Sequence, residues 1–378
     1  MTVELATLRA EFPIAEEWAY LNHAAIGPFS RRTEAAIAAV SGAFARPPSM
    51  GNAYGEAIET ARGNVAKFVG GTPDGVAFVG SLADAMSLVA AGIDWHPGDN
   101  VVMPQEEFPS NVYPFLNLGR LGVELRMVEK DEQGFTSLER VAAAMDGHTR
   151  AVVLSHVEFM TGYKNDLDAL GRLCQEHGAL SVVDATQSMG ALPIDVAQSG
   201  IDVIAAHGYK WLMASFGLGV VHLSERAIEA IHPVYVGRLS VALGFEELEY
   251  RIHWQPGARR YQTGGINWLG VAAFNASATL IEAAEPARTA AHCLALTDRL
   301  LAGVAELGYQ VTSCLDPAHR SQIVSFSSGD RDTDERLVEN LEAQQVSTTL
   351  RGRGVRVSPY FYNTEADIDR LLELLPPR

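Results

Sequence analysis

Short apolar runs alternate with amphipathic segments between about residues 75 and 224. Most of these runs are rich in β-branched residues and apolar on both faces, which is typical of strands in a sheet covered by helices. The seven runs are GVAFVG (75–80), NVVMPQ (100–105), ELRMVE (124–129), AVVLSHV (151–157), LSVVDAT (180–186), DVIAAHG (202–208) and LGVVHLS (218–224). The alternation predicts an α/β fold, a three-layer αβα sandwich around a mostly parallel seven-stranded sheet.

The intervening segments have helical periodicity. It is clear in LADAMSLVAAGI (82–93) and in DLDALGRLCQEHG (166–178), and the second of these closes on a glycine, as helix C-termini commonly do. After about residue 270 the pattern changes, because alanine-rich helical stretches (270–306) precede one strand-like run (321–328) and two more helical segments (331–343 and 365–375).

This change predicts a second, smaller α+β domain. We expect a large ligand-binding domain over residues 31–269 and a small C-terminal domain over residues 270–378. The N-terminal segment, residues 1–30, is expected to contribute to the small domain and to the active site.

The composition argues against nucleic-acid and membrane partners. The 378 residues include 46 acidic and 29 basic side chains, for a formal net charge of −17, and no block of Lys or Arg interrupts this balance. A nucleic-acid partner is therefore not expected. No window approaches the roughly 18 apolar residues of a membrane helix, and the N-terminus lacks a signal pattern, so we expect a cytoplasmic protein with no membrane partner. The three cysteines, at positions 174, 293 and 314, are widely spaced and indicate neither a disulfide framework nor a metal site.

Polar side chains gather where strands are predicted to end, and ligands of open α/β sheets bind outside the carboxyl ends of the strands. They are Ser81 after the first run, Asp184 and Gln187 after the fifth, and His207, Tyr209 and Lys210 after the sixth. Taken singly, Ser81 is an ordinary helix N-cap, Asp184 caps a turn, and Lys210 extends to the surface. Their occurrence together favours a shared ligand.

The lysine, the carboxylate and the helix start each suit one part of the same cofactor. A buried lysine can lose its proton and attack an aldehyde. A carboxylate can hold a protonated pyridine nitrogen, and free N–H groups at a helix start suit a phosphate. Aldehyde, pyridine and phosphate together predict pyridoxal 5′-phosphate (PLP). Nicotinamide binding is not favoured, because no G-x-G-x-x-G follows the first strand.

The chain resembles the class V aminotransferases, a family of fold-type I PLP-dependent enzymes. The matching pattern is Asp184, Gln187, Gly190, Pro193 and Asp195, followed by Gly208, Lys210, Trp211 and Leu212. The resemblance extends to YLNHAAIGP (20–28) and RVSPYFYNTEADIDRLL (356–372), and so covers nearly the whole chain.

The resemblance implies roles for residues around the cofactor ring and the substrate. Lys210 forms the Schiff base and moves the proton at the substrate Cα, while Asp184 pairs with the pyridine nitrogen. Gln187 bonds the ring oxygen and Phe108 covers the ring face. The resemblance also implies that Arg356 grips the substrate carboxylate and that Asn22 approaches the substrate.

Other roles implied by the resemblance concern the phosphate. Ser81, the N–H of Leu82, His207 and Tyr209 are expected to surround it. In the family, the stretch corresponding to RRYQTGGIN (259–267) reaches the partner's phosphate, which assigns Thr263 and Gly265 to that role and implies a homodimer with shared active sites.

The chain also resembles the cysteine desulfurases in its scaffold. It differs from them at two positions of the site, and these differences argue against their reaction. Desulfurases use a cysteine on a loop before the Arg356 position, whereas QQVSTTLRGRGVRVS (344–358) contains none. They also stack a histidine where this chain has Phe108. The FPSN and YK features are closer to the isopenicillin N epimerase-like branch.

We therefore expect an amino-acid substrate and β-elimination of the C–S lyase type from a cysteine derivative. Transamination and racemisation, with His23 as a second base, remain alternatives. A scaffold that binds PLP without catalysis is not favoured, because the Lys210, Asp184 and Arg356 set is complete.

Overall fold

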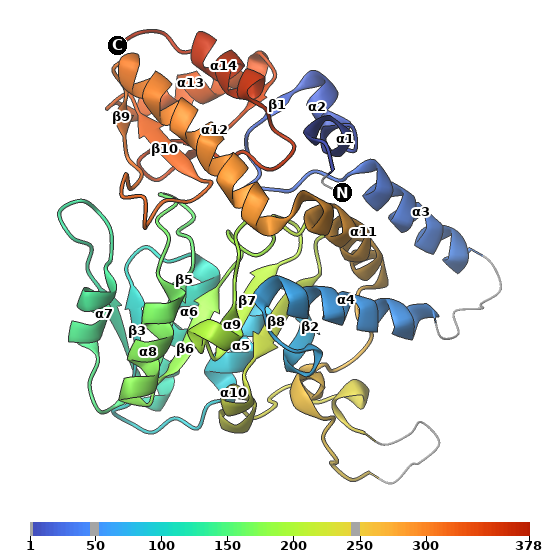
Figure 1. Cartoon of the computed structure of the whole chain (residues 1–378). Coiled ribbons are helices and arrows are strands. Elements are labelled where there is room, and N and C mark those ends of the chain that lie inside the picture. The colour runs from blue at the N-terminus through green and yellow to red at the C-terminus, as the bar shows by residue number, and fades with distance from the viewer. Residues whose placement is uncertain (1–2, 46–52, 243–249) are drawn as a thin grey trace.

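The computed structural model of the chain describes residues 3–45, 53–242 and 250–378. At its centre lies a seven-stranded sheet in the order β2-β8-β7-β6-β5-β3-β4 (Figure 1). The strands are β2 (Val76–Val79), β3 (Asn100–Pro104), β4 (Glu124–Val128), β5 (Thr149–Ser155), β6 (Leu180–Asp184), β7 (Val203–His207) and β8 (Gly219–Leu223). Each strand overlaps one of the seven apolar runs.

The strands from β3 to β7 pair in parallel, and β8 runs antiparallel to both of its neighbours, β7 and β2. The predicted mostly parallel sheet is therefore confirmed. The carboxyl ends of β5, β6 and β7 meet at one edge, where Ser155, Asp184 and Ala205 lie side by side in register. This edge carries the polar residues that the sequence placed at strand ends.

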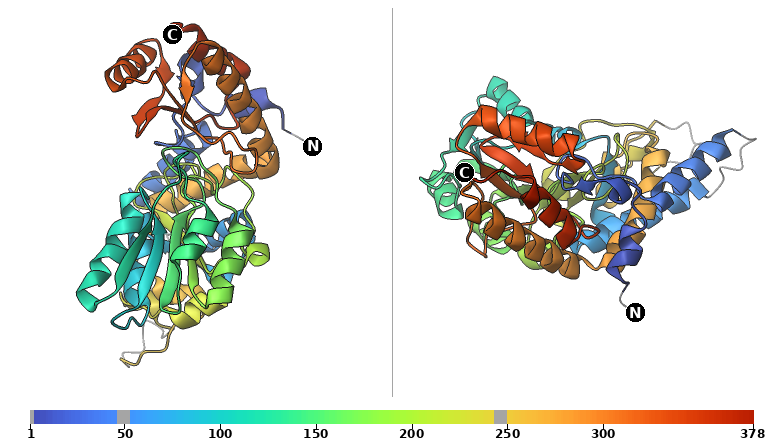
Figure 2. Two further views of the ribbon diagram at one scale, coloured as in Figure 1. Left: turned by 90° about the vertical axis from the view of Figure 1, so that its left-hand side faces the viewer. Right: turned by 90° about the horizontal axis from the view of Figure 1, so that it is seen from above.

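Successive side chains of the strands enter two separate cores. Val102 and Val152 pack on one face of the sheet, whereas Val101 and Val153 pack on the other. Figure 2 shows the helices on both sides of the strands. The first face is covered by α4 (Ala53–Val69), α7 (Leu138–Ala144), α8 (Leu167–His177), α9 (Val196–Ser199) and α11 (Trp268–Ala284), and the second by α5 (Leu82–Gly92), α6 (Pro109–Leu116) and α10 (Glu225–Ala230). The fold is therefore a three-layer αβα sandwich, as predicted.

The C-terminal part forms a smaller α+β unit, also as predicted. Its antiparallel sheet has the order β12-β13-β10-β9, and its core is shared with three helices. The elements are α12 (Pro286–Glu306), β9 (Gln310–Val311), β10 (Val324–Ser327), α13 (Arg331–Ala343), β11 (Val346–Ser347), β12 (Thr349–Arg351), β13 (Gly354–Val357) and α14 (Glu365–Glu373). Single 3₁₀ turns occur at Pro73–Gly75, Asn117–Leu121, Arg238–Ser240 and Gly257–Tyr261.

The N-terminal segment lies beside the C-terminal elements (Figures 1 and 2). It contains α1 (Leu5–Arg9), α2 (Ile14–Glu17) and β1 (Ala19–Tyr20), and α3 (Arg31–Phe44) follows it. β1 pairs in parallel with β11. The domain limits at residues 30 and 269 stay a prediction; α11, which spans the second limit, shares its hydrophobic core with α4.

Within the described ranges, we find no helix that combines the length and the apolar character needed to cross a bilayer.

A bidentate ion pair joins the N-terminal segment to α14. The Arg9 guanidinium donates to both carboxylate oxygens of Asp367, at 2.8 and 3.0 Å, and the Asp367 side chain is only 7% exposed. The same carboxylate accepts the Thr364 N–H at 2.8 Å, which caps α14. Because these bonds are charge-assisted and partly desolvated, they contribute more than an exposed pair does.

We predict that Asp367→Asn lowers the free energy of unfolding by about 2 kcal/mol, because the charged acceptor of several hydrogen bonds is lost. The matched control is Asp369→Asn, on the same helix, whose pair with Arg299 is exposed on both sides. That substitution is expected to cost less than about 1 kcal/mol. Urea denaturation measures both, and equal losses would contradict the assignment.

Candidate active site

The candidate site lies at the carboxyl ends of β6 and β7. Asp184 is the last residue of β6 and His207 the last of β7, and Lys210 follows in the turn that leads to β8. This turn is fixed by its backbone, since Gly208 donates to the Leu218 carbonyl at 2.8 Å and Ala214 donates to the Gly208 carbonyl at 2.8 Å. The turn therefore holds Lys210 at the edge of the sheet next to Asp184.

The Lys210 side chain is almost fully buried, at 7% exposure. Its Nζ lies 5.4 Å from the centre of the Phe108 ring. Burial lowers the pKa of Lys210 to about 8; the Asp184 carboxylate opposes this shift, and the charges of Arg356 and Arg351 add to it. A substantial fraction of the amine is therefore neutral near pH 8, and the neutral amine is the form that attacks a carbonyl.

The N-terminal segment closes over the backbone of the same turn. The Gly27 N–H donates to the Tyr209 carbonyl at 2.9 Å. A Cβ at position 27 would lie 2.1 Å from the Lys210 carbonyl oxygen, so only glycine allows this approach. The segment thus limits the access of water to Lys210.

Asp184 is held by one hydrogen bond from its own segment and one from another segment. Its carboxylate accepts the Thr186 N–H at 2.7 Å and the Asn111 side-chain amide at 3.1 Å. Burial raises the pKa of Asp184, while these bonds and the Lys210 ammonium oppose the rise. The two donors bind different oxygens of Asp184 and so fix the orientation of its carboxylate at the end of β6.

A further buried acid, Glu107, lies behind Asn111. The Asn111 amide nitrogen donates to Glu107 at 2.9 Å as well as to Asp184, so it bridges the two carboxylates. Ser155 donates to Glu107 from both its N–H and its hydroxyl, each at 2.6 Å. Burial raises the pKa of Glu107 and raises that of Glu158 well above its usual value, and the negative charge of Asp184 adds to both shifts. The Asn111 amide is thus held between two carboxyl groups, which fixes its orientation toward Asp184.

The residues assigned to a phosphate meet at the start of α5. Ser81 is the N-cap of this helix, and its hydroxyl accepts the Asp84 N–H at 3.2 Å. The Leu82 N–H points at His207 Nδ1, at 3.4 Å. Burial lowers the pKa of His207 to about 4, so its ring is neutral and accepts a hydrogen bond. Tyr209 stacks on Phe216, with ring centres 4.2 Å apart.

Gln187 is engaged by its own chain. Its side-chain nitrogen donates to the Ala24 carbonyl at 3.1 Å, and its oxygen accepts the Trp211 indole N–H at 2.8 Å. A side-chain amide carries two N–H groups, so one of them is left for a ligand.

Unpartnered polar atoms mark the substrate side of the site. Arg356, on β13, is 2% exposed and donates from Nη1 to the Phe159 carbonyl at 2.6 Å, while its Nε has no hydrogen-bond partner among the described residues. Asn22 donates to the Thr348 carbonyl at 3.3 Å, and its buried Oδ1 likewise has no partner in the described part of the chain. Buried polar groups are rarely left unpaired, so a donor and an acceptor here indicate a polar ligand.

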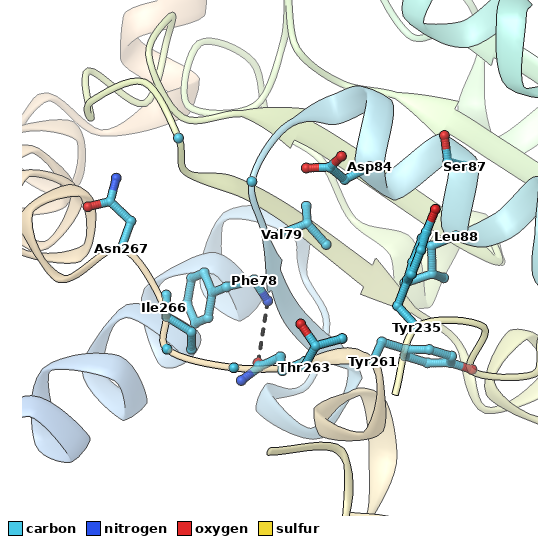
Figure 3. Close-up of a pocket in the computed structure, with 15 residues that line it drawn as sticks. Phe78, Val79, Asp84, Ser87, Leu88, Tyr235, Tyr261, Thr263, Ile266 and Asn267 are labelled. Carbon is cyan, nitrogen blue, oxygen red and sulfur yellow. Dashed lines mark hydrogen bonds between the residues drawn. The ribbon is translucent and has the colours of Figure 1, made fainter. Parts of the chain in front are cut away.

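The stretch with Thr263 and Gly265 lies elsewhere on the same chain. Both residues are exposed and line a cavity of about 490 Å³ together with Gly80 and Asp84, next to the start of α5 (Figure 3). The structure does not bring them to Lys210, which is not among the described residues that line this cavity.

These residues fit PLP. A buried amine at the end of one strand, a buried carboxylate at the end of the next, and a helix N-terminus on a third segment match its aldehyde, pyridine nitrogen and phosphate. Lys210, Asp184, Phe108 and the start of α5 would hold the cofactor.

Comparison with known families agrees with this fit. The family described as Aminotransferase class-V matches residues 46–371. The chain belongs to this family. It is a PLP-dependent enzyme, and the predicted family, enzyme class and cofactor are confirmed.

This class V chain is also similar to individual proteins. It is 29% identical to a probable cysteine desulfurase of Methanothermobacter thermautotrophicus over 336 residues, which cover 84% of this chain and 82% of the relative. Among solved structures, the apo cysteine desulfurase of Thermococcus onnurineus covers 99% of this chain and 98% of its own, at a TM-score of 0.89 and 21% identity. The structure of the cystine C–S lyase C-DES, in complex with its product cysteine persulfide, covers 96% of this chain and 98% of its own. Its TM-score is 0.87 and its sequence identity is 22%. At these identities the two structures show a shared fold.

Two residues next to Asp184 in the structure were not identified from the sequence. Glu107 and Asn111 flank Phe108 in the sequence, but their contacts with Ser155 and Asp184 join segments far apart in the chain. The spacing of four between Glu107 and Asn111, at the start of a helix, was the only local signal that they face each other.

We predict that the Lys210 amine of the cofactor-free protein titrates near pH 8 rather than at its ordinary 10.5. Asp184→Asn is expected to lower this midpoint, since a carboxylate that stabilises the ammonium is lost, and Arg356→Gln to raise it, since a repelling charge is lost. The pH dependence of Lys210 acetylation, followed by peptide mass spectrometry, measures all three. A wild-type midpoint near 10.5, or shifts of the opposite sign, would contradict this environment.

Proposed function

We propose that this class V enzyme catalyses β-elimination from a cysteine-derived amino acid. The observation that carries the proposal is the combination of a complete deprotonation site, formed by Lys210, Asp184 and Arg356, with the absence of a thiol from residues 344–358, which include β12 and β13. The site is thus equipped to break the substrate C–S bond but has no sulfur acceptor on that stretch.

Bound PLP supplies an aldehyde for the substrate amine and an electron sink for the electrons released at Cα. Arg356 binds the α-carboxylate through the N–H groups that its own chain leaves free, and so orients the Cα–H bond. Lys210 takes the Cα proton. The Cβ–S bond then breaks, sulfur leaves with the electron pair as a thiolate, and the three-carbon fragment hydrolyses with one water to pyruvate and ammonium.

The surroundings of Lys210 support elimination over racemisation. Racemisation by two bases needs a second base on the far side of the substrate, and His23 is the residue considered for that role. Its ring is fully buried, Nδ1 lies 3.0 Å from the Tyr362 hydroxyl, and it packs against Trp211 and Tyr360. Burial lowers the pKa of His23 to about 3. A histidine with so low a pKa is a weak base, poorly suited to exchange the Cα proton near neutral pH.

The cysteines support the absence of a persulfide step on the enzyme. Cys174 and Cys293 are fully buried, and burial raises the pKa of Cys174 to about 12 and also raises that of Cys293. Cys314 is half-buried and precedes β10, outside the 344–358 stretch. The likeness to the cystine C–S lyase C-DES, which is crystallised with its product, agrees with this choice.

We propose the remaining predicted features as part of the same function. The enzyme is a cytoplasmic homodimer, in which Thr263 and Gly265 contribute to the partner's phosphate site. Their exposure in the single chain supports this, as do the exposed apolar side chains Tyr235 and Phe216 nearby.

The test is product analysis of the PLP-loaded enzyme with S-substituted L-cysteines. We predict one pyruvate and one thiol per substrate consumed, over many turnovers. Lys210→Ala is expected to abolish this, since the base is lost, and Lys67→Ala, an exposed lysine on α4, to leave it unchanged.

Other products would contradict the proposal in distinct ways. A keto acid with one equivalent of aminated cofactor would assign transamination instead. Recovery of the D-enantiomer would assign racemisation.

A further inference from the structure

The β12–β13 hairpin presents two arginines on one face. Thr349 pairs with Arg356 and Arg351 pairs with Gly354 in the antiparallel register. Residues two apart on a strand share a face, so Arg351 lies on the same face as Thr349 and therefore as Arg356. Diagonal neighbours of this kind are separated by about 7–8 Å. Arg356 is buried and Arg351 exposed, so the face leads from the interior to solvent.

Neither guanidinium is neutralised by the described part of the chain. Arg356 donates to the Phe159 carbonyl, and Arg351 makes a long contact of 3.5 Å with the carbonyl of its neighbour Leu350. Within the described ranges, no carboxylate forms an ion pair with either residue, in contrast to arginines such as Arg9, Arg126 and Arg299. Two cations therefore face the site without an acid between them.

The charges of Arg351 and Arg356 act on each other and on the Lys210 amine. Burial lowers the pKa of Arg356 to about 9, and the charge of Arg351 adds to this shift. Both arginines also lower the pKa of Lys210. Like charges held together cost free energy unless an anion relieves the repulsion. One carboxylate on Arg356 relieves only part of it.

We propose that Arg351 binds a second anionic group, carried by the substrate side chain, so that the enzyme prefers amino acids whose sulfur substituent or side-chain terminus is acidic. This inference rests on the proposed function, in which Arg356 holds the α-carboxylate. The planar guanidinium suits a carboxylate, sulfinate or sulfonate group.

The test compares the binding of isosteric acidic and neutral amino acids to the PLP-loaded enzyme. The pairs are L-aspartate with L-asparagine, and L-cysteate with the neutral S-methyl-L-cysteine sulfone. Dissociation constants come from the change in cofactor absorption, at constant ionic strength. We expect the acidic member of each pair to bind at least about tenfold more tightly, as one charge-assisted hydrogen bond allows.

Arg351→Gln is expected to remove this preference by weakening only the acidic ligands. The matched control is Arg353→Gln, an exposed arginine in the turn of the same hairpin, which is expected to retain it. Both positions are exposed and without ion pairs in the described structure, so an unchanged cofactor spectrum verifies the fold of each variant.

Three outcomes overturn the proposal. Equal binding of acidic and neutral members by the wild type shows that no second anion site exists. Equal weakening of both members by Arg351→Gln shows that Arg351 acts on the α-carboxylate instead. A cofactor spectrum that responds to no amino acid contradicts the proposed function itself, and this inference with it.

Discussion

Removing the Lys210 amine from water favours its neutral form, and only the neutral amine attacks a carbonyl. The segments around Lys210 exclude water from its amine, and a nearby carboxylate limits the cost of burying its charged form. Gly27 lies against its backbone, Phe108 lies near its Nζ, and Asp184 offsets part of the desolvation. The closing N-terminal segment, the small domain and the sheet edge all converge on this one side chain.

The large sheet places the acid that the site requires. Because β6 and β7 are parallel neighbours, their carboxyl ends put Asp184 and Lys210 on one edge without any special loop. The acid is then held by the Thr186 N–H, directly after β6, and by Asn111 on α6, whose amide also reaches Glu107. The small domain adds Arg356 from β13.

Much of this arrangement was predictable from sequence, because strands buried on both faces leave apolar runs and parallel strands end at one edge. The positions of Asp184, His207 and Lys210 follow from that pattern. The contacts of Asn111 and the shared face of Arg351 and Arg356 do not, since they depend on which distant segments meet and on the register of a short hairpin. The site roles carried over from the family remain predictions to be measured.

The most direct measurement is borohydride reduction of the PLP-loaded enzyme, followed by proteolysis and mapping of the peptide that carries the reduced cofactor. The account predicts one cofactor per chain, attached to Lys210 in the peptide that contains Tyr209 and Trp211. Attachment to any other lysine would contradict it.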